Sequence, residues 1–182
     1  MKPRGPMMIE HRLIEKMLNI AHRELALIKK NKNVNPVFID TVVDFIRTYA
    51  DRTHHGKEED ILFKRLETRR LEEKYRKMMQ DLIDEHIAAR KVVGALVEAN
   101  MKYVNGDLNS IDIIIDKLAF LIDFYPKHII KEDKIFFPDT EKYFSAEELD
   151  DMLKSFWEFD RMMIHEKYNK LYDSLAKKYQ GN

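Results

Sequence analysis

Residues 54–63 read HHGKEEDILF, and residues 128–138 read HIIKEDKIFFP, so the chain carries one pattern twice. Each copy has a histidine, a glutamate four positions later and then an apolar triplet. On a helix, residues four positions apart lie one above the other on the same face. The pairs His54/Glu58 and His128/Glu132 can therefore present an imidazole and a carboxylate to one metal ion, or the carboxylate can bridge two. Chance pairs on a solvated surface would explain one copy, but they explain two copies with the same flanks poorly.

The composition narrows the class of protein. The chain has 182 residues, 32 basic and 32 acidic side chains, and no cysteine. The balanced charge gives no field that favours nucleic acid or a membrane as a partner, and the lack of cysteine excludes disulfides, iron–sulfur ligation and thiol catalysis. No apolar run reaches the ~18 residues of a membrane span, and residues 1–6 lack a signal-peptide core. We therefore expect one cytoplasmic domain that comprises residues 1–182.

Apolar residues recur at helical spacing in five segments, which begin near residues 6, 35, 71, 109 and 145. Asn35-Pro36 and the capping box at Ser145 and Glu148 mark two helix starts, and Asn105-Gly106 is a left-handed stop. The connections among the first four segments are short, which implies antiparallel neighbours. The predicted fold is therefore all-α: an up-down-up-down four-helix bundle of about residues 7–140 with an appended C-terminal fifth helix of about residues 145–179.

The axial level of the polar residues predicts a shared site. In an up-down bundle, two residues lie at the same height when the turn between them falls at their sequence midpoint. The expected turns near residues 34, 71 and 107 meet this condition for one set of residues from four helices: His11, His54, Glu58, His86, His128 and Glu132. Such agreement is hard to obtain from a solvated surface.

The direction of the side chains separates the two neighbouring histidines of the first copy. The apolar stripe of Ile46 and Ala50 continues to His54, whereas His55 is turned about 100° further around the helix. We therefore assign His54 to the site and expect His55 to lie outside the ligand set or to face solvent. His22 has no partner at its level and is expected to be an ordinary surface or core-edge histidine.

His165, in the predicted fifth helix, leaves two interpretations open. Its position relative to the start of that helix places it at the right height for the site. It lies well off the apolar stripe of the same helix, which would direct it elsewhere. His165 is therefore a possible seventh ligand.

Imidazoles and carboxylates without sulfur suit iron, manganese or zinc. Four histidines and two glutamates are too many for one closed zinc site and about right for two six-coordinate ions with open positions. The di-iron proteins of the ferritin-like class use Glu-x-x-His motifs. No histidine in this chain has a glutamate three positions before it, which disfavours that class.

Together these motifs resemble the hemerythrin-like, or HHE cation-binding, domain family. The resemblance covers roughly residues 7–140 and rests on Glu10-His11, Glu85-His86 and the two His-x-x-x-Glu copies with their Leu-Phe and Phe-Phe-Pro flanks. It implies a non-haem centre of two iron ions in a four-helix bundle, bridged by Glu58 and Glu132. His11 and His54 would bind one iron, and His86 and His128, with His165 as a candidate, would bind the other.

One departure from the family pattern bears on function. Oxygen-carrying hemerythrins place a His-x-x-x-His pair on the third helix, but Leu82 and Arg90 stand at those spacings from His86. Either one coordination position is open, or His165 fills it. The family's last carboxylate can also fall one position later, at Asp133; we prefer Glu132 because it keeps the two copies alike.

Three functional hypotheses follow. The first is a di-iron protein that binds O2 or a related small ligand such as nitric oxide or peroxide, in oxygen binding, sensing or storage. The second is a di-iron enzyme for peroxide or nitric oxide chemistry, or for iron donation in cluster repair. The third is a metal-free structural helical bundle. The sequence does not decide among iron, manganese and zinc, and it does not give the oligomeric state.

Overall fold

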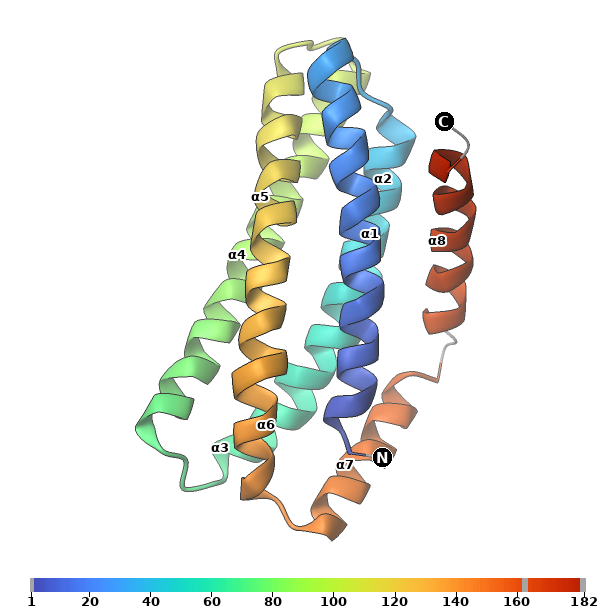
Figure 1. The fold of residues 1–182 in the computed structure, drawn as a ribbon. Helices are drawn as coiled ribbons and strands as arrows, with labels where there is room; N and C mark the ends of the chain where they lie inside the picture. The colour runs from blue at the N-terminus through green and yellow to red at the C-terminus, as the bar shows by residue number, and fades with distance from the viewer. Residues whose placement is uncertain (1, 162–163, 181–182) are drawn as a thin grey trace.

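The computed structural model describes residues 2–161 and 164–180, and all regular secondary structure within these ranges is helical. This confirms the predicted all-α class. Four long helical segments form the body of the molecule (Figure 1). Two of them change helix type along their length. The first is α1 (Arg4–Asn31) and the third is α4 (Glu73–Val104). The second comprises α2 (Pro36–Phe45), the π-helices η1 (Ile46–His55) and η2 (Glu58–Phe63), and α3 (Lys64–Glu67). The fourth comprises α5 (Ser110–Lys131), the π-helix η3 (Glu132–Phe136), α6 (Phe137–Thr140) and the 3-10 turn η4 (Glu141–Tyr143).

The local signals in the sequence act as expected. The Asn35 side chain accepts a hydrogen bond from the backbone N–H of Phe38, with proline at the first helical position. Ser145 and Glu148 form a complete capping box. Gly106 has a φ of 94°, a left-handed conformation that glycine adopts without strain and that ends the third segment. These residues fix where three of the helices begin or end.

The four segments pack around two apolar clusters. α5 contacts both α1 and α4, and α2 contacts α4. The larger cluster includes Leu13, Ala50, Val93 and Tyr125. The smaller cluster lies toward the other end of the bundle and includes Met7, Leu62, Leu82 and Phe136. Along each long segment, the predicted site residues fall between members of the two clusters. The packing therefore positions a polar layer between two apolar cores.

The expected single C-terminal helix is wrong. The structure has two helices there, α7 (Ala146–Phe159) and α8 (Ile164–Gln180), with a turn at Asp160 and Arg161. No proline or glycine marks the break in the sequence. It coincides with two tertiary contacts: Asp160 accepts hydrogen bonds from the buried Lys57, and the ring of Phe159 lies against Gly56, where a Cβ atom would lie 2.8 Å from it.

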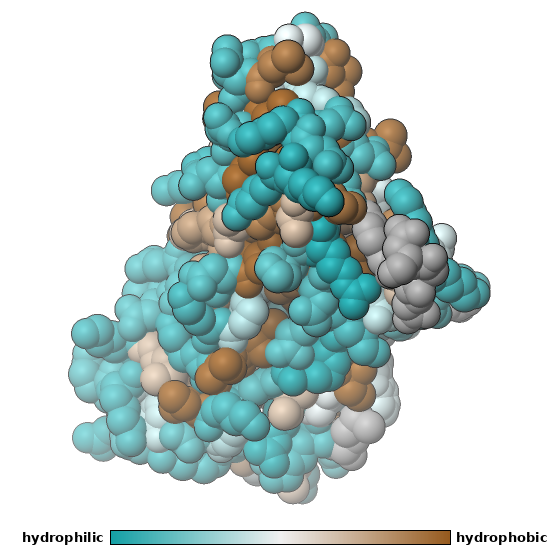
Figure 2. Space-filling model, turned by 45° about the horizontal axis from the view of Figure 1, so that its top comes forward, coloured by the Kyte–Doolittle hydropathy of each residue, from teal (hydrophilic) through white to brown (hydrophobic). Residues whose placement is uncertain are grey.

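The surface is mainly polar. The face seen in Figure 2 is covered mostly by hydrophilic residues with apolar side chains interspersed, in keeping with a chain in which 35% of residues are charged. Within residues 2–161 and 164–180, no helix combines the length and the apolar character needed to cross a bilayer.

Candidate metal centre

Seven histidine and glutamate side chains converge in the polar layer, and each is at most 2% exposed. They are His11, His54, His55, Glu58, His86, His128 and Glu132. Six of them are the residues that the axial-level argument selects. They come from all four long segments, so the site exists only in the folded chain.

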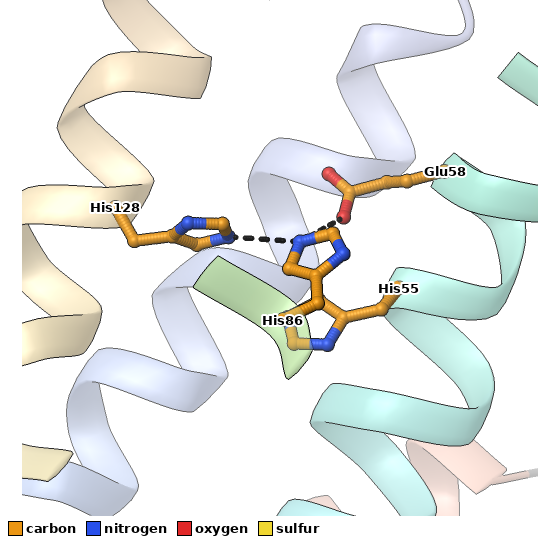
Figure 3. A group of neighbouring side chains, drawn as sticks. All are labelled: His55, Glu58, His86 and His128. Atoms are coloured by element: carbon orange, nitrogen blue, oxygen red, sulfur yellow. Dashed lines mark hydrogen bonds and ion pairs between the residues drawn. The ribbon is translucent and has the colours of Figure 1, made fainter. Parts of the chain in front are cut away.

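The converging side chains divide into two groups. The three-histidine group is His55, Glu58, His86 and His128, and the two-histidine group is His11, His54, Glu58 and Glu132. Within each group, one potential ligand atom per residue lies within 4.8 Å of all the others. Figure 3 shows the three-histidine group, in which Glu58 and His128 approach His86 from different helices. Because Glu58 belongs to both groups, the groups are neighbours.

The two glutamates lie between the groups. The Oε1 and Oε2 atoms of Glu58 lie 3.5 Å from Nε2 of His54 and 3.4 Å from Nε2 of His86, respectively. The Oε1 and Oε2 atoms of Glu132 lie 3.1 Å from Nε2 of His128 and 3.2 Å from Nε2 of His11. Each carboxylate therefore directs one oxygen toward each group, as a carboxylate that bridges two ions would.

Several of these atoms have no hydrogen-bond partner among the described residues, although they are fully buried. They are Nε2 of His11 and of His54 and both carboxylate oxygens of Glu58 and of Glu132. Burying polar atoms without partners is unfavourable by about 1–3 kcal/mol each. Imidazole nitrogens and carboxylate oxygens are good ligands for iron, manganese and zinc. The residues present thus fit a pair of metal ions, whose binding would satisfy these atoms.

The electrostatics of the glutamates point the same way. Burial and the facing charge of Glu132 raise the pKa of Glu58 well above its usual value. Burial also acts to raise the pKa of Glu132, but the positive charge of His128 and the nearby His11 outweigh burial and lower it well below its usual value. Two adjacent buried negative charges repel each other, so the simultaneous ionisation of both carboxylates is disfavoured without a cation. Cations between them would allow both to ionise.

An outer carboxylate holds each of the five histidines through its Nδ1 atom. The pairs, with Nδ1–O distances, are His11–Asp133 (2.7 Å), His54–Glu10 (2.7 Å), His55–Asp51 (3.3 Å), His86–Glu59 (2.7 Å) and His128–Glu85 (2.8 Å). An ionised carboxylate accepts the Nδ1–H, which leaves Nε2 of the ring as the potential ligand. Such pairing orients the ring and raises its basicity toward a metal.

The expectation that His55 faces solvent is wrong, and the structure brings His55 into the three-histidine group. His55 is buried, and its ring stacks on His86 with centroids 3.8 Å apart, whereas the ring of His54 lies 4.4 Å from that of His11. Residues 46–55 form a π-helix, whose i→i+5 hydrogen bonds change the direction of successive side chains relative to an α-helix. Both neighbours therefore face the interior, one toward each group. The doubled histidine itself was the available signal.

The position of His55 bears on the departure from the family pattern, in which the third helix lacks a second histidine four positions from His86. Arg90 stands four positions after His86, and its guanidinium donates to Asp51 (2.8 Å) and to Glu59 (2.7 Å). These two acids hold His55 and His86. The third imidazole of the group comes from η1, and Arg90 supports its outer carboxylates.

The remaining candidates lie outside the two groups. Nε2 of His165 lies 3.0 Å from Asp160, and its Nδ1 lies 2.8 Å from the hydroxyl of Tyr49, so the structure does not bring His165 together with the other six predicted residues. Asp133 binds Nδ1 of His11 and Arg12 and does not lie between the groups. His22 is exposed, as expected.

Comparison with known proteins agrees with this geometry. The family model of the hemerythrin HHE cation binding domain matches residues 6–140, a range that contains all seven converging side chains. Neither a curated protein nor a solved structure gives a significant match to the chain. Since the matched range covers most of the sequence, the chain belongs to the hemerythrin HHE cation binding domain family.

Proposed function

We propose that this protein binds two iron ions between its four long helical segments and uses the pair to bind O2 or a related small ligand such as nitric oxide. The observation that carries the proposal is the position of Glu58 and Glu132, each with one oxygen toward each histidine group. A single-ion site would not need two carboxylates shared in this way.

The residues would act in distinct roles. His55, His86 and His128 would hold one ion, and His11 and His54 would hold the other, with Glu58 and Glu132 between them. When bound, a ferrous pair supplies the electrons and the coordination positions that small oxygen- or nitrogen-containing ligands require. The two-histidine group has one imidazole fewer, so the ion there would keep more room for an external ligand.

The apolar clusters and the outer carboxylates around the centre keep its side chains in fixed positions. The two apolar clusters lie on either side of the layer and hold its side chains in place. The outer carboxylates hold the Nδ1 atom of each imidazole, so the rings are oriented before any metal binds. Both features reduce the rearrangement needed on ligand binding.

The test is anaerobic loading with two equivalents of ferrous iron, followed by metal analysis and optical spectra before and after O2 is admitted. We expect two iron ions per chain and charge-transfer bands that appear with O2. Bands that fade on deoxygenation would support oxygen carriage, and bands that persist would support sensing or redox chemistry. A protein that retains no iron would contradict the proposal.

A further inference from the structure

A third group of potential ligand residues lies outside the metal centre and consists of Glu10, Asp160 and His165. Glu10 is buried, and the other two are partly buried. Nε2 of His165 lies 3.4 Å from Oε1 of Glu10. The group already holds a cation, because the ammonium of the buried Lys57 donates to Glu10 and, at 2.8 and 2.9 Å, to the two oxygens of Asp160. The lysine takes the place that a third metal ion would need.

One member of this group touches the metal centre. Oε2 of Glu10 lies 2.7 Å from Nδ1 of His54, and its Oε1 accepts from Lys57. A carboxylate held at both oxygens cannot turn away from the imidazole that it orients. Since Nε2 of His54 faces Glu58, Lys57 keeps Glu10 in the position that directs His54 toward the centre.

The contacts continue outward from Lys57 to the C-terminal helices. Nε2 of His165 lies 3.0 Å from Oδ2 of Asp160, and its Nδ1 lies 2.8 Å from the hydroxyl of Tyr49. The hydroxyl can donate to Nδ1, which leaves the Nε2–H of a neutral imidazole to donate to Asp160. Asp160 then receives donors from both Lys57 and His165, so its position is fixed from two sides.

A second contact holds the same junction of α7 and α8 against the first copy of the pattern. The ring of Phe159 lies so close to Gly56 that a Cβ atom there would be 2.8 Å from it, and glycine permits this approach. α8 then runs alongside α1 and η1 (Figure 1). Asp160 and His165 lie beyond residues 6–140, the range that the family model matches. The junction therefore adds contacts to the centre from outside the matched domain.

The second copy has only the inner part of this arrangement. Glu85 lies 2.8 Å from Nδ1 of His128 and accepts from Lys131. The side chain of Lys131 is 29% exposed, whereas that of Lys57 is fully buried. No second acid of the described chain pairs with Lys131. The outer contacts are thus particular to His54 and to the two-histidine group.

We propose that Asp160 and His165 are positioning residues of the metal centre: they act through Lys57 and Glu10 to orient His54, and so set the affinity of the two-histidine group for its ion. The proposal rests on the proposed function, because it assumes an ion at His54. It extends the determinants of the centre to the two C-terminal helices and makes the two ions unequal in their support.

The first experiment uses the metal-free protein and observes the Nδ1–H protons of its histidines by NMR. Asp160→Ala should move the His54 resonance upfield, because Glu10 is held less firmly, and should leave that of His128 unchanged. Glu158→Ala, at an exposed acid of α7, is the control and should change neither. Melting curves show which variants are folded, and His165→Gln takes the place of Asp160→Ala if the latter unfolds. An unchanged His54 resonance in a folded variant would overturn the proposal.

The second experiment titrates zinc, buffered by a chelator, and follows the Nε2 atoms by 15N NMR. Zinc takes the same ligands and is diamagnetic. In Asp160→Ala, half-occupancy of His11 and His54 should need about tenfold more free zinc, while the three-histidine group fills as in the unmodified chain. Asp160→Asn keeps one oxygen for Lys57 and should lose less.

Two results of this titration would contradict the proposal in distinguishable ways. Equal weakening of both groups, or of neither, would overturn the positioning role and leave the proposed function in place. An unmodified chain that binds neither zinc nor iron would overturn the proposed function and the positioning role together.

Discussion

The two copies of the His-x-x-x-Glu pattern hold matching places in two halves of the bundle. Both copies, residues 54–63 and residues 128–137, contact α1 and α4. In each copy the acid after the shared glutamate binds a histidine of one of these helices: Glu59 binds His86 of α4, and Asp133 binds His11 of α1. Each of these two acids also accepts a hydrogen bond from an arginine: Glu59 from Arg90, and Asp133 from Arg12. The sequence repeat is thus also a repeat of contacts.

The correspondence extends to the other outer carboxylates. Glu10 and Glu85 each precede a histidine in sequence, and each binds the first histidine of one copy. The lysine three positions after that histidine, Lys57 or Lys131, then binds the same glutamate. The contacts that orient the four common histidines are therefore encoded twice.

The first copy differs from the second in a second histidine and in a buried lysine. His55 follows His54, whereas the apolar Ile129 follows His128. Lys57 is fully buried beneath Asp160, whereas the side chain of Lys131 is 29% exposed. The comparison teaches that the repeat provides the common framework, while the first copy adds a third imidazole and a link to the C-terminal helices.

The largest expected effect comes from removing the first histidine of either copy. His54→Ala or His128→Ala should reduce the bound metal to about one ion per chain or less, because each removes a ligand and frees its outer carboxylate. Metal analysis after loading measures this. His22→Ala, on the exposed surface, is the control and should keep full metal content. Equal content in all three variants would refute the assigned site.

Substitution of Lys57 and of Lys131 tests whether the lysine of the first copy contributes more stability than its counterpart in the second. Lys57→Met should lower the free energy of unfolding by about 3–5 kcal/mol, because it leaves the buried carboxylate of Glu10 and the partly buried carboxylate of Asp160 without this cation. Lys131→Met should cost less than about 1 kcal/mol, since solvent screens its pair. Urea unfolding of the metal-free variants compares them. Similar losses would mean that the C-terminal link contributes no stability.

The matched outer acids test the likeness of the halves. Glu59→Gln and Asp133→Asn should each weaken metal affinity by about 10–100-fold, because a neutral amide holds the imidazole less firmly. Competition with a chelator gives the affinities. Glu67→Gln, an exposed position on the same segment as Glu59, should have no effect. A loss in only one of the two variants would break the correspondence.

A pH dependence separates the first histidines of the two copies. Burial opposes the charge of His128, but Glu132 and Glu85 outweigh it and raise its pKa to about 9. Burial and the charge of His11 lower the pKa of His54 to about 4. At neutral pH His128 must therefore lose a proton to bind metal, and His54 need not.

Metal affinity should accordingly rise with pH until His128 deprotonates near pH 9, by about tenfold per pH unit for each proton released. Calorimetry in buffers of different ionisation enthalpy counts the protons. In His128→Ala the total number of protons released per chain should lack the one that His128 contributes. Metal binding that is independent of pH between 6 and 9 would contradict this prediction.

Much of this centre could be predicted from the sequence. The helix caps at Asn35 and Ser145 and the stop at Gly106 act through nearby backbone atoms, so their meaning is local. The heights of His11, His54, His86 and His128 follow from helix geometry once the turns are known. That is why six of the seven converging residues are found by counting along the chain.

The directions of His55 and His165 could not be predicted in the same way. Counting in steps of an α-helix turns His55 outward, but residues 46–55 form a π-helix. The position of His165 depends on a break at Asp160 that no proline or glycine announces. Both follow from contacts between segments distant in sequence.

The sequence by itself therefore determined the helical class, the ends of several helices and the level at which histidines and glutamates gather, because these depend on short-range periodicity. Only the tertiary structure decided that His55 faces inward, that His165 contacts Asp160 and Tyr49, and that Glu58 and Glu132 lie between two groups. The physical reason is that packing and buried charge set the direction of a side chain, and both require the complete fold.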